Sequence, residues 1–198
     1  MMESTGVVLA GGQSRRYGEE KPIARKDGKA FVLYSVDALV HLDKTIMVTR
    51  PDLVGRLPRT EQVQIITDLE KYRGLGPLAG IFSAMTHVVS RWYVVLPCDM
   101  PWIEQQAVKK LQSCQDEKWD VICSRLHGQR QPLFAVYHRR VKEKIRSKLD
   151  NRELGMQRFL EDCAVLEAEF AEEKWFYNVN TREEFTKLCK ITGTQENG

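Results

Sequence analysis

The most chemically suggestive segment of the chain lies near its N-terminus, where glycines and cations follow a short apolar run. Gly11 and Gly12 end that run, and Arg15, Arg16 and Lys21 come soon after. Adjacent glycines let the backbone approach a ligand closely and turn amide donors toward phosphate oxygens, while cations neutralise those oxygens. The segment therefore predicts a phosphate-binding loop. The alternative is a tight turn after a strand, with the cations in solvent.

Two common phosphate-binding motifs do not fit this segment. Five residues separate Gly12 from Gly18 where a Walker A loop has four, and Glu19 and Glu20 stand where that loop needs lysine and Ser/Thr. The spacing also differs from the Gly-x-Gly-x-x-Gly pattern of dinucleotide-binding folds. The residues thus indicate a phosphate site of another class.

A carboxylate follows a second apolar run, in the stretch from Tyr93 to Pro101. Asp99 lies between Pro97 and Pro101. Mg²⁺ prefers hard oxygen ligands and keeps several waters, so one or two carboxylates with substrate phosphates can make a site for it. The alternative is that Asp99 is the N-cap of the next helix. Pro101 and Glu104 indicate that this helix begins farther along, which favours Asp99 as a metal ligand.

Three other polar features remain open on residue type alone. Asp68 follows an apolar run and could be a second carboxylate of the same pocket, but its spacing alone favours a turn residue. Asn178 and Asn180 flank one valine and have the composition of turns or caps. The cationic loop 125–130 suits either a second anionic substrate or ordinary solvated surface.

Short β-branched and aromatic runs alternate with longer amphipathic runs, which is typical of an open α/β sheet with crossover helices. We expect strands over 5–10, 44–49, 63–67, 92–97, 120–124, 132–138 and 164–169, and helices over 31–42, 78–89, 104–114, 139–149, near Met156 and from Thr181. Thr181 and Glu184 predict a capping box at the last helix. Ligands of such sheets bind beyond the carboxyl ends of the strands, which places the expected site after Ala10, Thr67 and Pro97.

Composition limits the class of protein. The chain has 198 residues, 42% hydrophobic residues, 30 basic and 27 acidic residues, and a net charge of +3. We expect one domain over 1–193 with a frayed tail at 194–198. The charge balance predicts no nucleic-acid partner, and the absence of a long apolar run predicts a cytoplasmic protein without a membrane segment. Five scattered cysteines predict reduced thiols rather than a zinc site.

Taken together, the motifs resemble the molybdenum cofactor guanylyltransferase (MobA) family of small α/β nucleotidyltransferases. The matching segments span nearly the whole chain: 6–12, Arg16 with Gly18 and Lys21, Asp68, 76–81, 97–101, 132–137 and 178–181. Tyr17 and Glu20 stand where the family usually has Met and Asp. No asparagine can be placed near 49–51, where the family's second strand often ends in one.

The resemblance implies a Rossmann-like, doubly wound, mostly parallel sheet with helices on both faces. It also implies transfer of GMP from GTP to molybdopterin carrying molybdenum, with Mg²⁺ as cofactor and molybdoenzymes or their chaperones as partners. Cytidylyl or other nucleotidyl transfer, and non-catalytic nucleotide binding, remain the alternatives.

The resemblance assigns a role to each matching position. Leu9, Ala10, Gly11 and Gly12 would contact the nucleotide. Lys21, Arg16 and Asp99 would act in catalysis, Lys21 on the phosphates and Asp99 on both metal and nucleotide. Asp68 would contact the nucleotide as well, and Asn178 and Asn180 would face the pterin.

Overall fold

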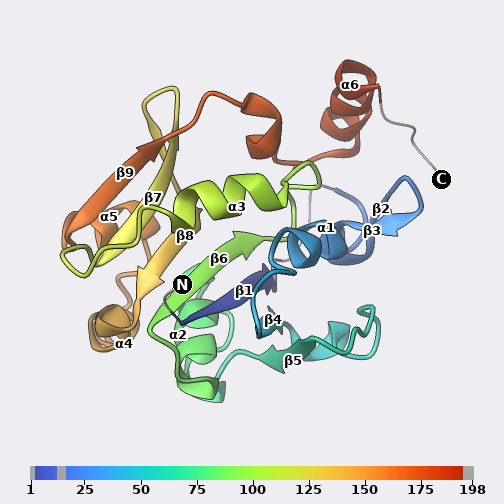
Figure 1. Cartoon of the computed structure of the whole chain (residues 1–198). Coiled ribbons are helices and arrows are strands. Elements are labelled where there is room, and N and C mark those ends of the chain that lie inside the picture. Colours follow the sequence, from blue (N-terminus) through green and yellow to red (C-terminus); the bar gives the residue numbers. More distant parts are fainter. Residues whose placement is uncertain (1–2, 13–16, 194–198) are drawn as a thin grey trace.

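The computed structural model describes residues 3–12 and 17–193, which form a central sheet covered by helices on both faces (Figure 1). The sheet of the described residues has the spatial order β5-β4-β1-β6-β8-β7-β9. Its strands are β1 (Ser4–Ala10), β4 (Thr45–Thr49), β5 (Val63–Thr67), β6 (Trp92–Pro97), β7 (Val121–Leu126), β8 (Gln129–His138) and β9 (Val165–Glu169). β8 is antiparallel to both of its neighbours and the other pairings in this sheet are parallel. The predicted doubly wound, mostly parallel sheet is confirmed.

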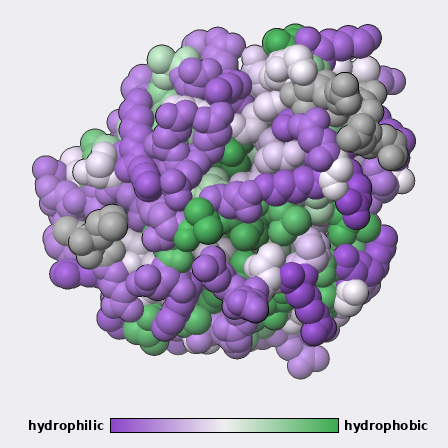
Figure 2. Space-filling view, turned by 45° about the vertical axis from the view of Figure 1, so that its right-hand side comes forward, coloured by the Kyte–Doolittle hydropathy of each residue, from purple (hydrophilic) through white to green (hydrophobic). Residues whose placement is uncertain are grey.

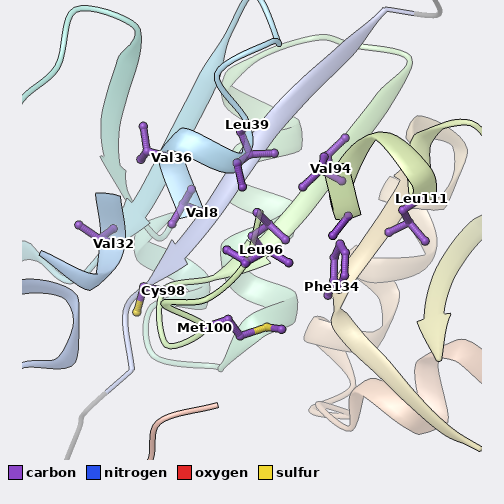
Figure 3. Packing of buried hydrophobic residues seen from close by; sticks show 14 of the residues in the cluster. Val8, Val32, Val36, Leu39, Val94, Leu96, Cys98, Met100, Leu111 and Phe134 are labelled. Atoms are coloured by element: carbon purple, nitrogen blue, oxygen red, sulfur yellow. The ribbon is translucent and has the colours of Figure 1, made fainter. Parts of the chain in front are cut away.

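Helices lie on both faces because the central strands are apolar on both sides, as β6 illustrates by being buried throughout. The helices are α1 (Phe31–Ala38), α2 (Pro77–His87), α3 (Gln105–Gln112), α4 (Lys142–Asp150), α5 (Met156–Glu161) and α6 (Arg182–Thr192). Helices α1 and α3 pack on one face, where Val36 and Leu111 belong to the same buried cluster as Leu96 and Phe134 of the sheet (Figure 3). Helices α2, α4 and α5 pack on the other face.

Three local features differ from the sequence-based expectation. Helix α1 ends at Ala38 rather than Leu42, because the amides of Leu39, Val40 and Leu42 donate to carbonyls three residues back instead of four. A short hairpin, β2 (Arg25–Lys26) with β3 (Lys29–Ala30), was not predicted, although its Asp27-Gly28 turn is a strong hairpin signal. β8 begins at Gln129 rather than Pro132. Its register with β7 shifts across the segment that contains the proline, which cannot donate to a ladder.

The order of the strands creates a switch point between β1 and β6. From β1 the chain moves to β4 and β5 on one side, and then returns to β6 on the other side of β1. The loops that follow β1 and β6 therefore diverge and leave a crevice at their carboxyl ends.

Helix α6 lies toward that end of the sheet (Figure 1). Its Phe185 packs edge-on against Phe31, with ring centroids 5.1 Å apart. The predicted capping box is confirmed, since Thr181 accepts from the Glu184 amide at 3.1 Å and the Glu184 carboxylate accepts from the Thr181 amide. Within the described residues no helix has the length and apolar character needed to cross a membrane.

Candidate active site

A cleft of about 580 Å³ opens at the carboxyl ends of β1, β4 and β6. Figure 2 turns this side of the molecule forward and shows apolar residues across its middle, bordered by hydrophilic ones. The cleft has the dimensions of a small-molecule site. Six of the residues singled out by the sequence line it: Leu9, Gly11, Gly12, Lys21, Asp68 and Asp99.

Lys21 and Asp99 form an ion pair in the cleft. The Lys21 Nζ donates to Asp99 Oδ2 at 2.9 Å, and the two side chains are only 14% and 20% exposed. Lys21 is the first residue of a short 3-10 helix. Glu20 precedes it, and the Glu20 carbonyl accepts from the amides of Ile23 and Ala24. Asp99 directly follows the buried strand β6 and Cys98. Two chain segments that are 78 residues apart in sequence thus place opposite charges together.

The segment that contains Asn178 and Asn180 lies against this ion pair. Lys21 Nζ also donates to the Val179 carbonyl at 3.0 Å and to Asn180 Oδ1 at 3.3 Å. The Val179 amide donates to the Asp99 carbonyl at 2.9 Å. The end of the Asn178 side chain that points at Asp99 meets only acceptor atoms, so this end must be the amide nitrogen. The nitrogen then donates to the two carboxylate oxygens of Asp99, at 2.7 and 3.0 Å. Both asparagines therefore orient the ion pair, and the exposed Asn178 is also open to a ligand.

Asp99 is not the N-cap of the following helix. Helix α3 begins at Gln105, and Glu104 is in the cap position. This confirms the later helix start expected from Pro101 and removes the competing explanation for the carboxylate.

The carboxylate of Asp99 fits a Mg²⁺ site in which a substrate supplies some of the ligands. Within the described residues no group of three or more His, Cys, Asp or Glu side chains could hold a metal by itself. An ionised carboxylate offers roughly four acceptor positions, so the contacts from Lys21 and Asn178 leave room for a further ligand. One carboxylate supplemented by phosphate oxygens and water is a common arrangement for Mg²⁺.

Asp68 lines the opposite part of the cleft after β5. Burial is the main cause that raises the pKa of its carboxyl group, although the Gly74 amide donates to its Oδ2 at 3.2 Å. The neighbouring helix comes close here because it carries Gly80, where a Cβ atom would lie 2.7 Å from Leu9 Cδ2. Asp68 is therefore a partly desolvated carboxylate in the cleft rather than a solvated turn residue.

Three predicted residues of the described structure do not line the cleft: Ala10, Asn178 and Asn180, although both asparagines contact the ion pair. Ala10 is fully buried in β1, and its carbonyl accepts from the Thr49 hydroxyl at 3.0 Å. Its neighbours Leu9 and Gly11 line the cleft instead. Arg16 and the predicted tail 194–198 lie outside the described residues.

Arg50 is a cleft residue that the sequence reasoning did not identify. It follows β4, where the resemblance left the family's asparagine without a counterpart. Its NH2 nitrogen donates to Glu20 at 2.7 Å and to Asp52 at 2.9 Å, and its NH1 nitrogen donates to the Gly12 carbonyl at 3.2 Å. Because these partners include residues 38 and 30 positions away, no local pattern could reveal them.

The cationic loop 125–130 forms the tip of the β7-β8 hairpin, with His127 and Gly128 at the turn. Arg125 pairs with Glu167 at 3.0 Å, and Arg130 pairs with the same carboxylate at 2.5 Å. The charges of these arginines are thus balanced by β9, which favours the solvated-surface alternative over a second anion site.

The switch-point cleft, its glycine pair and its lysine and carboxylates place the chain among the α/β nucleotidyltransferases. The chain belongs to the MobA-like NTP transferase domain family, which matches residues 6–168. The predicted family is therefore confirmed, and the chain is a nucleotidyltransferase.

Related proteins extend over almost the whole chain. A Bacillus cereus (strain ATCC 10987 / NRS 248) protein named "Probable molybdenum cofactor guanylyltransferase" is 36% identical over 195 residues, which cover 96% of this chain and 98% of the relative. The structure of molybdopterin-guanine dinucleotide biosynthesis protein A from Archaeoglobus fulgidus has a TM-score of 0.80 at 24% identity, covering 96% of this chain and 98% of that one. A Mycobacterium tuberculosis H37Rv protein, Rv0371C, solved as a complex with manganese, has a TM-score of 0.66 at 14% identity, with 95% and 98% covered. The last two show a common fold.

Proposed function

We propose that this chain transfers GMP from GTP to molybdopterin carrying molybdenum, producing the molybdopterin guanine dinucleotide cofactor and pyrophosphate. The observation that carries the proposal is the Lys21–Asp99 pair, which lines the switch-point cleft together with the glycine pair and contacts the 178–180 segment. The guanylyl and molybdopterin assignments are supported by the names of full-length relatives.

The reaction needs no general base. A phosphate oxygen of the acceptor is already anionic, so it can attack the α-phosphorus of GTP directly. The new bond joins that oxygen to the α-phosphorus, and the bond to the β-phosphate oxygen breaks with its electrons leaving on pyrophosphate. Catalysis therefore rests on alignment and on neutralisation of the charge that develops on the phosphates.

The candidate residues divide that work between them. The Leu9–Gly12 backbone and Asp68 hold the nucleotide, and Lys21 neutralises its phosphates together with Arg16. Asp99 would hold Mg²⁺, which when bound supplies further neutralisation of the phosphate charge. Asn178 and Asn180 orient the Asp99–Lys21 pair and face the acceptor.

Pyrophosphate release with molybdopterin as acceptor tests the proposal, with GTP, CTP and ATP supplied in turn and Mg²⁺ present or absent. We expect Mg²⁺-dependent release with a preference for GTP. Preference for CTP would overturn the guanylyl assignment. Binding of a triphosphate without release of pyrophosphate in any combination would indicate a binding protein and overturn the catalytic assignment.

Asp99→Ala tests the metal assignment in the same assay. Turnover should decrease on the order of 100-fold or more, because the carboxylate would no longer hold a cation at the reacting phosphates. Asp116→Asn is a suitable control, since Asp116 is an exposed carboxylate that pairs with Lys118 at 3.1 Å. Unchanged turnover in Asp99→Ala would exclude Asp99 as the metal ligand.

A further inference from the structure

Arg50 occupies a position from which one side chain reaches both ends of the segment between Gly12 and Glu20. Its NH1 nitrogen donates to the Gly12 carbonyl at 3.2 Å, and its NH2 nitrogen donates to Glu20 Oε1 at 2.7 Å. The side-chain stem lies beside Gly11, where an added Cβ would be 4.0 Å from Arg50 Cγ. A single guanidinium therefore connects β4 to the start and the end of the glycine-rich segment.

The buried position of the Glu20 carboxylate depends on its contact with Arg50. Its side chain is 24% exposed, and its Oε2 atom is buried without a hydrogen-bond partner in the described part of the chain. A carboxylate that is largely removed from water needs a compensating charge, and Arg50 provides it. Without Arg50 the Glu20 side chain would have to turn toward solvent.

The position of Glu20 in turn determines the direction of Lys21. The Glu20 carbonyl accepts from the Ile23 amide at 3.0 Å and from the Ala24 amide at 3.2 Å, which closes the turn on which Lys21 is the first residue. Lys21 then extends to Asp99 at 2.9 Å. A displacement of the Glu20 backbone would therefore shift the turn that carries the Lys21 ammonium group.

We propose that Arg50 is a positioning residue for the nucleotide-binding segment, acting through Glu20 to keep Lys21 directed at the phosphates and at Asp99. The planar guanidinium is needed because its nitrogens together reach three partners: Nε and NH2 donate to Asp52, NH2 also donates to Glu20, and NH1 donates to the Gly12 carbonyl. A lysine has one nitrogen and cannot span them. The inference rests on the proposed role of Lys21 in phosphate binding.

A double-mutant cycle on GTP affinity tests the inference, using calorimetry with Mg²⁺ and no acceptor. Arg50→Met should raise the Kd for GTP about 10–100-fold, because charge-assisted contacts to the segment are lost. In a Lys21→Met background the same substitution should change Kd less than about threefold, since the side chain that Arg50 positions is already absent. Equal effects in the two backgrounds would overturn the inference.

Three further variants separate positioning from simple charge. Glu20→Ala should reproduce the loss seen in Arg50→Met, because it breaks the same link. Asp116→Asn is the control, because Asp116 is an exposed carboxylate that pairs with Lys118 at 3.1 Å and does not line the cleft. It should change Kd less than about threefold. Full recovery of affinity in Arg50→Lys would show that charge alone suffices and would overturn the proposed geometry.

The result of the double-mutant cycle depends neither on the acceptor substrate nor on turnover, because the cycle measures only GTP binding. If GTP binds but no GMP is transferred, the proposed reaction fails while the cycle still reports on Arg50. Melting temperatures identify variants that fail to fold, and Arg50→Lys, which retains the packed stem, then replaces Arg50→Met in the cycle. An Arg50 variant with a normal melting temperature and normal GTP affinity would overturn the inference.

Discussion

Replacement of Lys21 by methionine removes an ammonium group from the lining of the cleft while keeping most of the length of the side chain. The Lys21 Nζ contacts three acceptors within 3.3 Å, on Asp99, Val179 and Asn180. An ammonium group has three donors, so a phosphate must displace at least one of these partners to bind. The variant therefore loses both a structural contact and the charge that the phosphates would use.

The two losses have different magnitudes. A hydrogen bond to a charged group contributes about 1.5–3 kcal/mol, but Asp99 keeps the Asn178 amide in the variant. We therefore expect the free energy of unfolding to decrease by about 1–2 kcal/mol, or a melting temperature lower by about 3–6 °C. Loss of a preorganised positive group at the reacting phosphates costs about 3–4 kcal/mol in the transition state, so kcat/KM should decrease about 100- to 1,000-fold.

Pyrophosphate release at varied GTP concentration measures kcat/KM, and thermal unfolding gives the stability of the same preparation. Lys21→Arg is the matched control, since it retains the charge but its planar group does not fit the same three acceptors, and we expect intermediate activity. A Lys21→Met variant that is folded and within about threefold of the wild-type kcat/KM would refute the assignment of Lys21 to the phosphates.

Asp68→Asn should raise the melting temperature by about 1–3 °C at neutral pH, because burial raises the pKa of this carboxyl group and its ionised form is disfavoured in the folded chain. GTP should bind more weakly to the same variant in calorimetry, and a lower melting temperature with unchanged affinity would contradict both expectations. Thr181→Ala should lower the free energy of unfolding in urea by about 1 kcal/mol, because the capping contact with Glu184 is lost, and no change would show that this helix end adds nothing to stability. The free energy of unfolding should also decrease as the pH falls below about 6.5: burial lowers the pKa of His138 in the folded chain, so the unfolded chain binds more protons, and protonation removes the acceptor that His138 offers to Arg140. Urea unfolding at several pH values measures this effect, and an unchanged slope in His138→Asn would exclude His138 as its source.

Most of the fold follows from local patterns in the sequence. Strands β1 and β6 are apolar because helices cover both faces of the sheet. Such continuous apolar runs can be recognised in the sequence without the structure. The capping box at Thr181 and the delayed start of α3 were predicted because their signals lie within a few residues. The Asp27-Gly28 turn of the β2-β3 hairpin is an equally local signal.

By itself, the sequence singled out the candidate site residues: the glycine pair, Lys21, Asp68 and Asp99 were predicted from residue type, from their place after apolar runs and from the family resemblance. Only the tertiary structure decided how they are held together. Lys21 meets Asp99 across 78 residues, and Arg50 meets Glu20 across 30. The physical reason is that the parallel sheet brings the carboxyl ends of distant strands to one edge, and contacts made there depend on strand order rather than on neighbouring residues.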